Sequence, residues 1–317
     1  MDVADDIETI LPPLPFAPAT GGVLLYMHVP KTGGTTIRNN FGNKTRFPDL
    51  HFYPIHQLSH MPRGEKMIQE RIVRRNKKYK TLFVEIHGRN CPTWLELAPM
   101  IQGWRKTAAA HHVPFFAFTL LREPVELAVS FFNFFRVTPG DDRFGPRVNS
   151  TQQNLLATLK YNPQCLFLTK GETAFFEHQK DNIFYNVTHQ DCIDVHTQLT
   201  QTLDWIGDTR HMSHDTLPLL TYLLTGNARH GQALPAANTA TARNSELVSV
   251  PTLDLAARQQ IHDMSMLDHQ LYQLAMATND IWQLPQFQAE SLRQWIPPWT
   301  AAEGPGGVRS DGEKDAQ

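Results

Sequence analysis

Short apolar runs alternate with longer amphipathic stretches along most of the chain. Residues 23–29, 81–86 and 114–121 form runs too short for buried helices, and their composition is typical of buried strands. A weaker fourth candidate is residues 204–207. Strands that alternate with helical stretches predict an α/β fold, in which helices flank a central, mainly parallel sheet within a single domain.

The segments between these runs are predicted to be helices or loops. Helical periodicity or composition covers residues 35–41, 64–80, 93–110, 124–136, 151–160, 189–204, 216–224 and 252–278, the last as one long helix. Three segments are predicted to be loops, because they are rich in Pro, in turn-forming residues or in polar residues: 44–64, 139–150 and 226–250. The last is long enough to be typical of a functional segment.

The two ends of the chain differ in composition from its middle. Residues 1–21 are acidic and Pro-rich and predict an irregular arm, whereas residues 301–317 predict a disordered tail. Residues 22–300 then form the domain. The start lacks a signal-peptide pattern, and no apolar run reaches the roughly 18 residues of a membrane span. We expect a soluble chain, either cytoplasmic or the luminal part of a longer protein.

Composition excludes several classes of protein. The 317 residues carry a formal charge of −2, which disfavours a basic nucleic-acid binder. Cys91, Cys165 and Cys192 form no CxxC pair, so a zinc ribbon has no support, while one bridge such as Cys165–Cys192 stays open. The 15 His residues show no metal-ligand spacing completed by a carboxylate or Cys, so we expect no metal.

The loop after the first predicted strand has the chemistry of a phosphate-binding site. Gly33 and Gly34 let the backbone wrap an anion closely, and the start of the next helix directs free N–H groups at it. Lys31 adds a positive charge. Thr32, Thr35 and Thr36 add hydroxyl donors. Lys31 precedes the glycines, so the loop is P-loop-like without being a Walker A motif. An ordinary strand-to-helix turn is the alternative.

A second anion site is predicted about 90 residues further on, again after an apolar strand. The guanidinium of Arg122 can bind a phosphate with two parallel hydrogen bonds. Pro124 is favoured in the first turn of a helix, and Ser130 lies two turns along on the face that Arg122 shares. Both loops follow strand ends, so we expect them to meet in one cleft together with residues 87–93.

These two motifs resemble those of sulfotransferases that use 3′-phosphoadenosine 5′-phosphosulfate (PAPS). His28 to Thr36, HVPKTGGTT, is similar to the 5′-phosphosulfate loop of the Golgi carbohydrate group, such as the heparan sulfate 2-O- and 6-O-sulfotransferases. Residues 122–130 resemble R-D-P-x-x-R-x-x-S, with Glu123 in place of Asp and Leu127 in place of the second Arg. The resemblance spans roughly residues 23–280.

The resemblance implies transfer of a sulfuryl group from PAPS to an acceptor hydroxyl of a carbohydrate by in-line displacement. Adenosine 3′,5′-bisphosphate (PAP) is then the product, and no metal is needed. The implied nucleotide-binding residues are Lys31, Thr32, Gly33, Gly34, Thr35, Thr36, Arg122, Ser130 and Arg243, the last for the 3′-phosphate. Lys31 also has a catalytic role, because it stabilises charge on the leaving phosphate.

The expected general base is His87, at the end of a predicted strand. A neutral imidazole can take the acceptor proton near pH 7, and the 6-O-sulfotransferases have a base His after a comparable strand. Glu85 and Glu96 are weaker candidates. The D-x-x-L-Y sequence that begins at Asp268 also resembles the family, and we expect it to serve packing.

Other functions stay open at this point. The acceptor is alternatively a small alcohol, a phenol or a peptide tyrosine. A nucleotide-dependent phosphotransferase needs magnesium and an acidic ligand, and a glycan-binding module needs no base. The basic residues 63–80 are either a solvated helix face or a contact surface for an anionic glycan.

Overall fold

The computed structural model describes residues 21–74, 79–89, 91–137, 146–181, 185–226 and 247–278. By its internal contacts the chain divides into Met1–Asn279 and Asp280–Gln317, and the second part lies outside the described residues. Most of the predicted arm, most of loops 139–150 and 226–250, and the tail 301–317 lie outside them too, and so does Arg243.

Five parallel strands form the centre of the molecule, which confirms the predicted α/β class. They are β1 (Val23–Met27), β2 (Leu50–Gln57), β3 (Thr81–Arg89), β4 (Phe115–Leu121) and β5 (Trp205–Asp208). Their order in the sheet is β2-β3-β1-β4-β5, and every pairing is parallel. All residues of β1 and β4 are buried, as continuous apolar runs in a covered parallel sheet should be.

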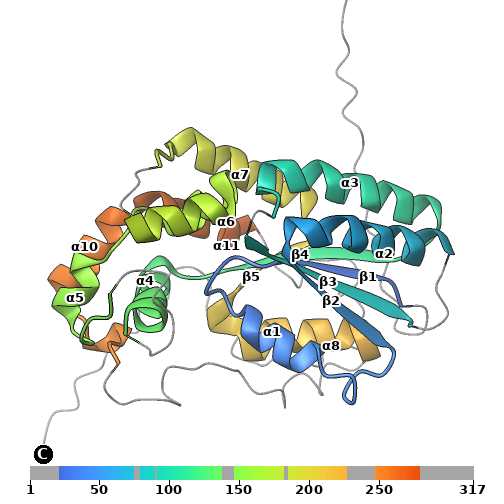
Figure 1. Ribbon diagram of the computed structural model, residues 1–317, viewed down its shortest axis with the longest axis horizontal. Coiled ribbons are helices and arrows are strands. Elements are labelled where there is room, and N and C mark those ends of the chain that lie inside the picture. The colour runs from blue at the N-terminus through green and yellow to red at the C-terminus, as the bar shows by residue number, and fades with distance from the viewer. Residues whose placement is uncertain are drawn as a thin grey trace, which may run out of the picture. The chain divides into compact units, whose positions relative to one another are not determined.

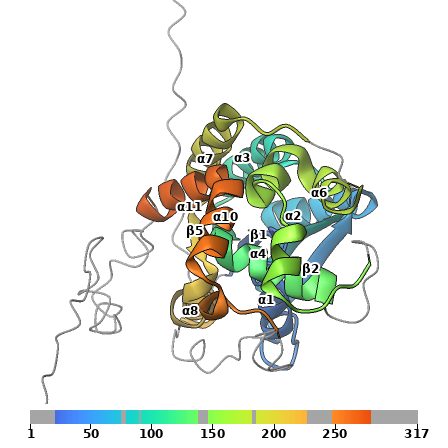
Figure 2. The same ribbon diagram turned by 90° about the vertical axis from the view of Figure 1, so that its left-hand side faces the viewer.

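Helices cover both faces of this sheet (Figures 1 and 2). Helices α1 (Gly34–Phe41) and α8 (Leu217–Thr225) lie on one face, and α2 (Met61–Arg74), α3 (Trp94–Ala110) and α7 (His189–Thr202) lie on the other. The chain therefore leaves β1 and the neighbouring β3 toward opposite faces, to α1 and α3. In open α/β sheets the crevice where connections diverge, beyond the strand carboxyl ends, is where ligands bind.

The remaining helices form a group beside the sheet. Helices α4 (Pro124–Phe132), α5 (Gln152–Ala157) and α10 (Leu255–Met264) share an apolar cluster that includes Phe132, Leu155 and Ile261. The other two are α6 (Pro163–Asp181) and α11 (Met266–Thr278), and short 3₁₀ or π segments occupy Leu58–His60, Asn133–Val137, Thr209–His211, Met212–Thr216 and Val250–Thr252. The disulfide Cys165–Cys192, which the sequence left open, joins α6 to α7.

Two element predictions are wrong, and one helix was missed. The segment predicted to be a loop, residues 44–64, contains strand β2. This strand lies at the edge of the sheet and pairs on one side only, so it can include Pro54, which has no N–H group to donate. The predicted helix 252–278 breaks at Ser265, whose hydroxyl bonds back to the Ile261 carbonyl at 2.6 Å. Helix α6 was not predicted, since the non-helical Gly171 (φ 79°) interrupts its pattern.

The D-x-x-L-Y segment packs as expected. Asp268 is fully buried, and its carboxylate accepts the backbone N–H groups of Gln164 and Cys165, each at 2.8 Å. It thereby caps the start of α6. The hydroxyl of Tyr272 donates to the carboxylate of Asp208 at the end of β5. Within the described residues, every helix is too short or too polar to traverse a lipid bilayer.

Candidate functional site

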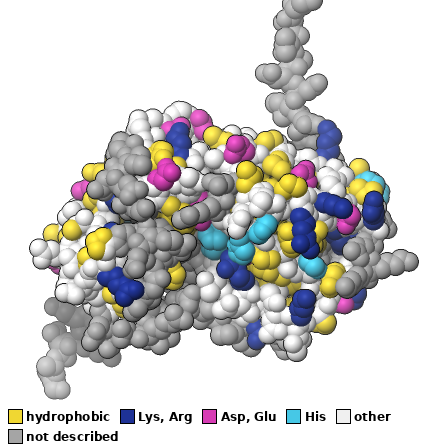
Figure 3. Space-filling view, in the orientation of Figure 1, with side chains coloured by type: hydrophobic (Ala, Val, Ile, Leu, Met, Phe, Trp, Pro, Cys, Tyr) yellow, Lys and Arg dark blue, Asp and Glu magenta, His cyan; other side chains and the backbone are white. Residues whose placement is uncertain are grey.

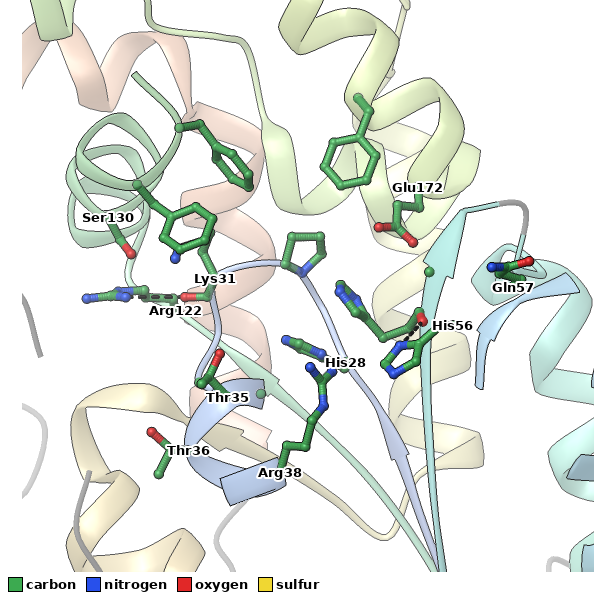
Figure 4. Close-up of a pocket in the computed structure, with 18 of the residues that line it drawn as sticks. His28, Lys31, Thr35, Thr36, Arg38, His56, Gln57, Arg122, Ser130 and Glu172 are labelled. Atoms are coloured by element: carbon green, nitrogen blue, oxygen red, sulfur yellow. Dashed lines mark hydrogen bonds between the residues drawn. The ribbon is translucent and has the colours of Figure 1, made fainter. Parts of the chain in front are cut away.

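A cavity of about 840 Å³ lies beyond the carboxyl ends of β1 to β4 (Figure 4). Residues from the three loops that the sequence singled out line it together, among them Lys31, His87 and Arg122. Histidines His28 and His56 line it as well. On the face drawn in Figure 3, His side chains gather in one patch beside basic side chains.

The loop between β1 and α1 is held in shape by its two glycines. Gly33 is the N-cap of α1 with φ 93°, and a Cβ there would lie 2.2 Å from Met212 Cε. A Cβ on Gly34 would lie 2.0 Å from the ring of His28. The amide of Ile37 donates to the Gly33 carbonyl at 3.2 Å. The N–H groups that precede it point out of the N-terminal end of the helix, as an anion site at a helix start requires.

Lys31 has an unusual backbone conformation, and its side chain packs against aromatic rings. Its φ is 67°, in the left-handed region that residues with a Cβ rarely adopt. Its Nζ lies 3.6 Å from the ring centroid of Phe134 and 5.9 Å from that of Phe135. Burial, helped by the nearby charge of Arg122, lowers the pKa of Lys31 to about 7. In the described part of the chain, no carboxylate forms an ion pair with Lys31.

The Arg122 backbone is clamped from a distant helix. The side-chain amide of Gln164 accepts from the Arg122 N–H at 2.9 Å and donates to its carbonyl at 2.8 Å. The guanidinium donates to the Lys31 carbonyl at 3.2 Å, and its Nε lies 3.5 Å from the Glu126 carboxylate. Burial lowers the pKa of Arg122. Ser130, on α4, lines the same side of the cavity (Figure 4).

The three threonines of the loop differ in placement. Thr35 and Thr36 line the cavity. Thr32 is fully buried, does not line it, and donates its hydroxyl to the Val29 carbonyl at 2.7 Å. Thr32 therefore stabilises the conformation of the loop by a hydrogen bond within it.

His87 lies within β3, which continues to Arg89, whereas the sequence placed it just after the strand. Burial, together with the charge of His28, lowers the pKa of His87 well below the ordinary value. The imidazole is therefore neutral at physiological pH and can accept a proton. Its Nδ1 is buried and makes no hydrogen bond. The backbone carbonyl of His87 accepts from His56 Nδ1 at 3.3 Å.

Neither rival base reaches the cavity. Glu85 is fully buried, with its two carboxylate oxygens 3.0 and 2.9 Å from Arg38 Nε and Nη2. Burial opposes its ionisation, but the contacts with His28 and Arg38 outweigh that and lower the pKa of Glu85 to about 2. Glu96 sits in the first turn of α3, where it forms a capping box with Thr93.

Sequence reasoning missed several residues of this site. His28 belonged to the quoted motif but had no assigned role, and Arg38 and Phe134 had none either. The pattern did carry one signal for His28. It follows β1 just as His87 follows Ile86, and the β1–β3 register pairs Met27 with Ile86.

The assembled cavity can bind an anion on one side and remove a proton on the other. Lys31, Arg122 and Ser130 lie together in Figure 4, apart from His56, Gln57 and Glu172. Among the described residues, no group of three or more His, Cys, Asp and Glu side chains is arranged to hold a metal ion. No protein-family model matches the chain, and no curated protein matches it.

Proposed function

We propose that this chain transfers a sulfuryl group from PAPS to an acceptor hydroxyl, with a carbohydrate as the acceptor class. One observation carries the proposal. The loop that contains Lys31 and leads into α1 shares a single cavity with the buried, neutral His87. The loop suits an anionic leaving group, and the histidine suits a general base. The resemblance of the two loop motifs adds the identity of the donor.

The residues present fit the donor. Lys31 and the backbone N–H groups at the start of α1 would hold the phosphate that carries the sulfuryl group. Arg122 and Ser130, on the same side, would hold the second phosphate. Their fit rests on a donor set of two cations, a hydroxyl and backbone N–H groups. When bound, PAPS supplies a sulfuryl group on a good leaving phosphate.

The residues of the chain would then divide the work. His87 takes the proton of the acceptor hydroxyl as that oxygen bonds to sulfur, because a neutral imidazole carries a nitrogen that can accept one. Lys31 and the loop amides stabilise the negative charge that develops on the phosphate oxygen. Phe134, Phe135 and Phe176 line the cavity with apolar surface, which strengthens these electrostatic interactions.

Calorimetric titration with PAP tests the donor site. We expect the purified chain to bind PAP at micromolar concentration and to ignore ATP with magnesium. Lys31→Ala should weaken PAP binding, whereas Lys44→Ala, an exposed lysine beyond the end of α1, should not. Magnesium-dependent binding of ATP alone would instead indicate a phosphotransferase, and binding of neither nucleotide would refute the donor site.

Transfer of radioactive sulfate from labelled PAPS tests the acceptor class. A panel of an oligosaccharide, a phenol, a small alcohol and a tyrosine peptide covers the possible hydroxyls. We expect label on the oligosaccharide. Label on only the phenol or the peptide would keep sulfuryl transfer and refute the carbohydrate assignment. PAP binding without transfer to any member would favour a glycan-binding module.

A further inference from the structure

A buried imidazole–carboxylate pair lies directly beneath the proposed base. His28, only 6% exposed, has its Nδ1 2.9 Å from Glu85 Oε1, and Glu85 is fully buried. The ring of His28 packs against the ring of His87 with centroids 4.0 Å apart. In Figure 4 the side chains of His28 and Arg38 lie next to each other. A buried histidine held by a carboxylate is a costly arrangement, so it calls for an explanation.

This pair ties the base to the donor loop. The ring of His28 fills the space where a side chain on Gly34 would lie, so it touches the phosphate loop from below. Arg38, from the helix that the loop starts, binds both oxygens of Glu85. The loop, helix α1 and strand β3 thus meet at one cluster of charged and polar side chains. A shift of any member moves the surface on which His87 rests.

We propose that His28 and Glu85 act as a positioning dyad, which holds His87 in place against the donor loop. Glu85 fixes the orientation of the His28 ring, and that ring fixes His87. The catalytic meaning of this dyad rests on the proposed function, whereas its effect on His87 can be measured in the free protein.

The two members of the dyad have opposite effects on the pKa of His87, and this difference can be measured. From its own strand Glu85 raises the pKa of His87, whereas His28, just after β1, and Arg38 on α1 lower it. His56 from β2 and Glu172 from α6 line the same cavity. Removing the carboxylate should therefore lower the pKa of His87 further, and removing His28 should raise it. A general loosening of the site would move both in one direction.

The experiment compares His28→Asn and Glu85→Gln with two matched surface controls, His189→Asn and Glu70→Gln. His189 is exposed on α7, and Glu70 forms a surface ion pair with Arg74 on α2. Three quantities are measured for each protein: the NMR titration of the His87 imidazole, the affinity for PAP, and kcat and KM against pH. The His87 resonance is assigned by its absence in His87→Asn.

We expect His28→Asn to lower kcat about 10²-fold, the scale of a misplaced catalytic group, while KM and PAP affinity stay near wild type. The His87 titration should move to higher pH in His28→Asn and to lower pH in Glu85→Gln. The acid limb of the kcat/KM profile should move in the same directions. The controls should match wild type in every readout.

Two results would overturn the dyad. One is that His28→Asn changes neither the pKa of His87 nor kcat from its wild-type value. The other is a fall in PAP affinity as large as the fall in kcat, which would limit His28 to shaping the loop. If Glu85→Gln does not fold, His28→Asn alone decides. A wild-type protein without PAP binding refutes the proposed function, yet its His87 titrations still test the dyad.

Discussion

The two sides of the cavity differ in how their charged side chains are paired. On the side lined by Lys31, Arg122 and Ser130, which we propose as the donor side, Lys31 faces aromatic rings, and burial lowers the pKa values of Lys31 and Arg122. On the side of His87, His28 and Glu85, which we propose as the base side, the carboxylate of Glu85 lies at hydrogen-bond distance from Arg38 and His28. Two cations thus lie close to each other on the donor side, whereas the buried anion of the base side already has cationic partners in the free protein.

The difference shows which side should respond to ligand and which should hold the fold. Cations that are held close to each other and away from water gain most when an anion arrives. A satisfied buried ion pair is costly to break, because removal of one partner leaves the other charge uncompensated. Substitutions on the two sides should therefore affect different measurements.

The largest expected effect concerns turnover. Lys31→Ala and His87→Asn should each lower kcat by about 10²–10³-fold or more, because one removes charge stabilisation and the other the base. Only Lys31→Ala should also weaken PAP binding. Steady-state kinetics with calorimetry checks this, and circular dichroism should show an unchanged fold. Full activity of His87→Asn would contradict its assignment as the base.

The next effect concerns stability on the base side. The pKa of Glu85 is about 2 when folded and 4.5 ordinarily, so its contribution is complete above pH 4.5 and is lost as pH falls toward 2. That difference corresponds to about 3 kcal/mol. Urea unfolding from pH 7 to 3 should show this loss in wild type, and Glu85→Gln should flatten the curve. Parallel curves for the two proteins would contradict the prediction.

A smaller effect separates affinity from stability on the donor side. Arg122→Ala should weaken PAP binding by about 10²-fold, since one charged hydrogen-bonding partner contributes about 1.5–3 kcal/mol. The free energy of unfolding of the free protein should not fall, because burial already disfavours this charge. Arg74→Ala, at an exposed side chain on α2, is the control for both measurements. Unchanged PAP affinity would remove Arg122 from the site.

The smallest effect, taken per pH unit, is the pH dependence of binding. Lys31, with a pKa of about 7, loses its charge as pH rises above that value, so PAP binding there must take up a proton. The affinity should fall by up to about tenfold per pH unit between pH 7 and 9. Phe134→Ala admits water to the amine and should flatten this dependence. Calorimetry in buffers of different ionisation enthalpy measures the proton uptake directly.

Much of the fold could be predicted because most of its strands are marked by short apolar runs in the sequence. Four of the five strands were predicted from buried apolar runs, and the order of loops and helices follows from them. The edge strand β2 was missed, since its Pro54 and mixed composition resemble a loop, and only pairing with β3 makes it a strand. Helix α6 was missed, and its backbone is non-helical at Gly171.

The sequence by itself determined where the chemistry stands in the chain: a glycine loop with Lys31 after one strand, Arg122 after another, and His87 near the end of a third. These are consequences of residue type and local spacing. The tertiary structure decided which side chains meet. It turned Thr32 away from the cavity, seated Lys31 on Phe134, and set His28 and Glu85 beneath His87. The reason is that such contacts depend on strand register and helix placement, which join residues far apart in sequence.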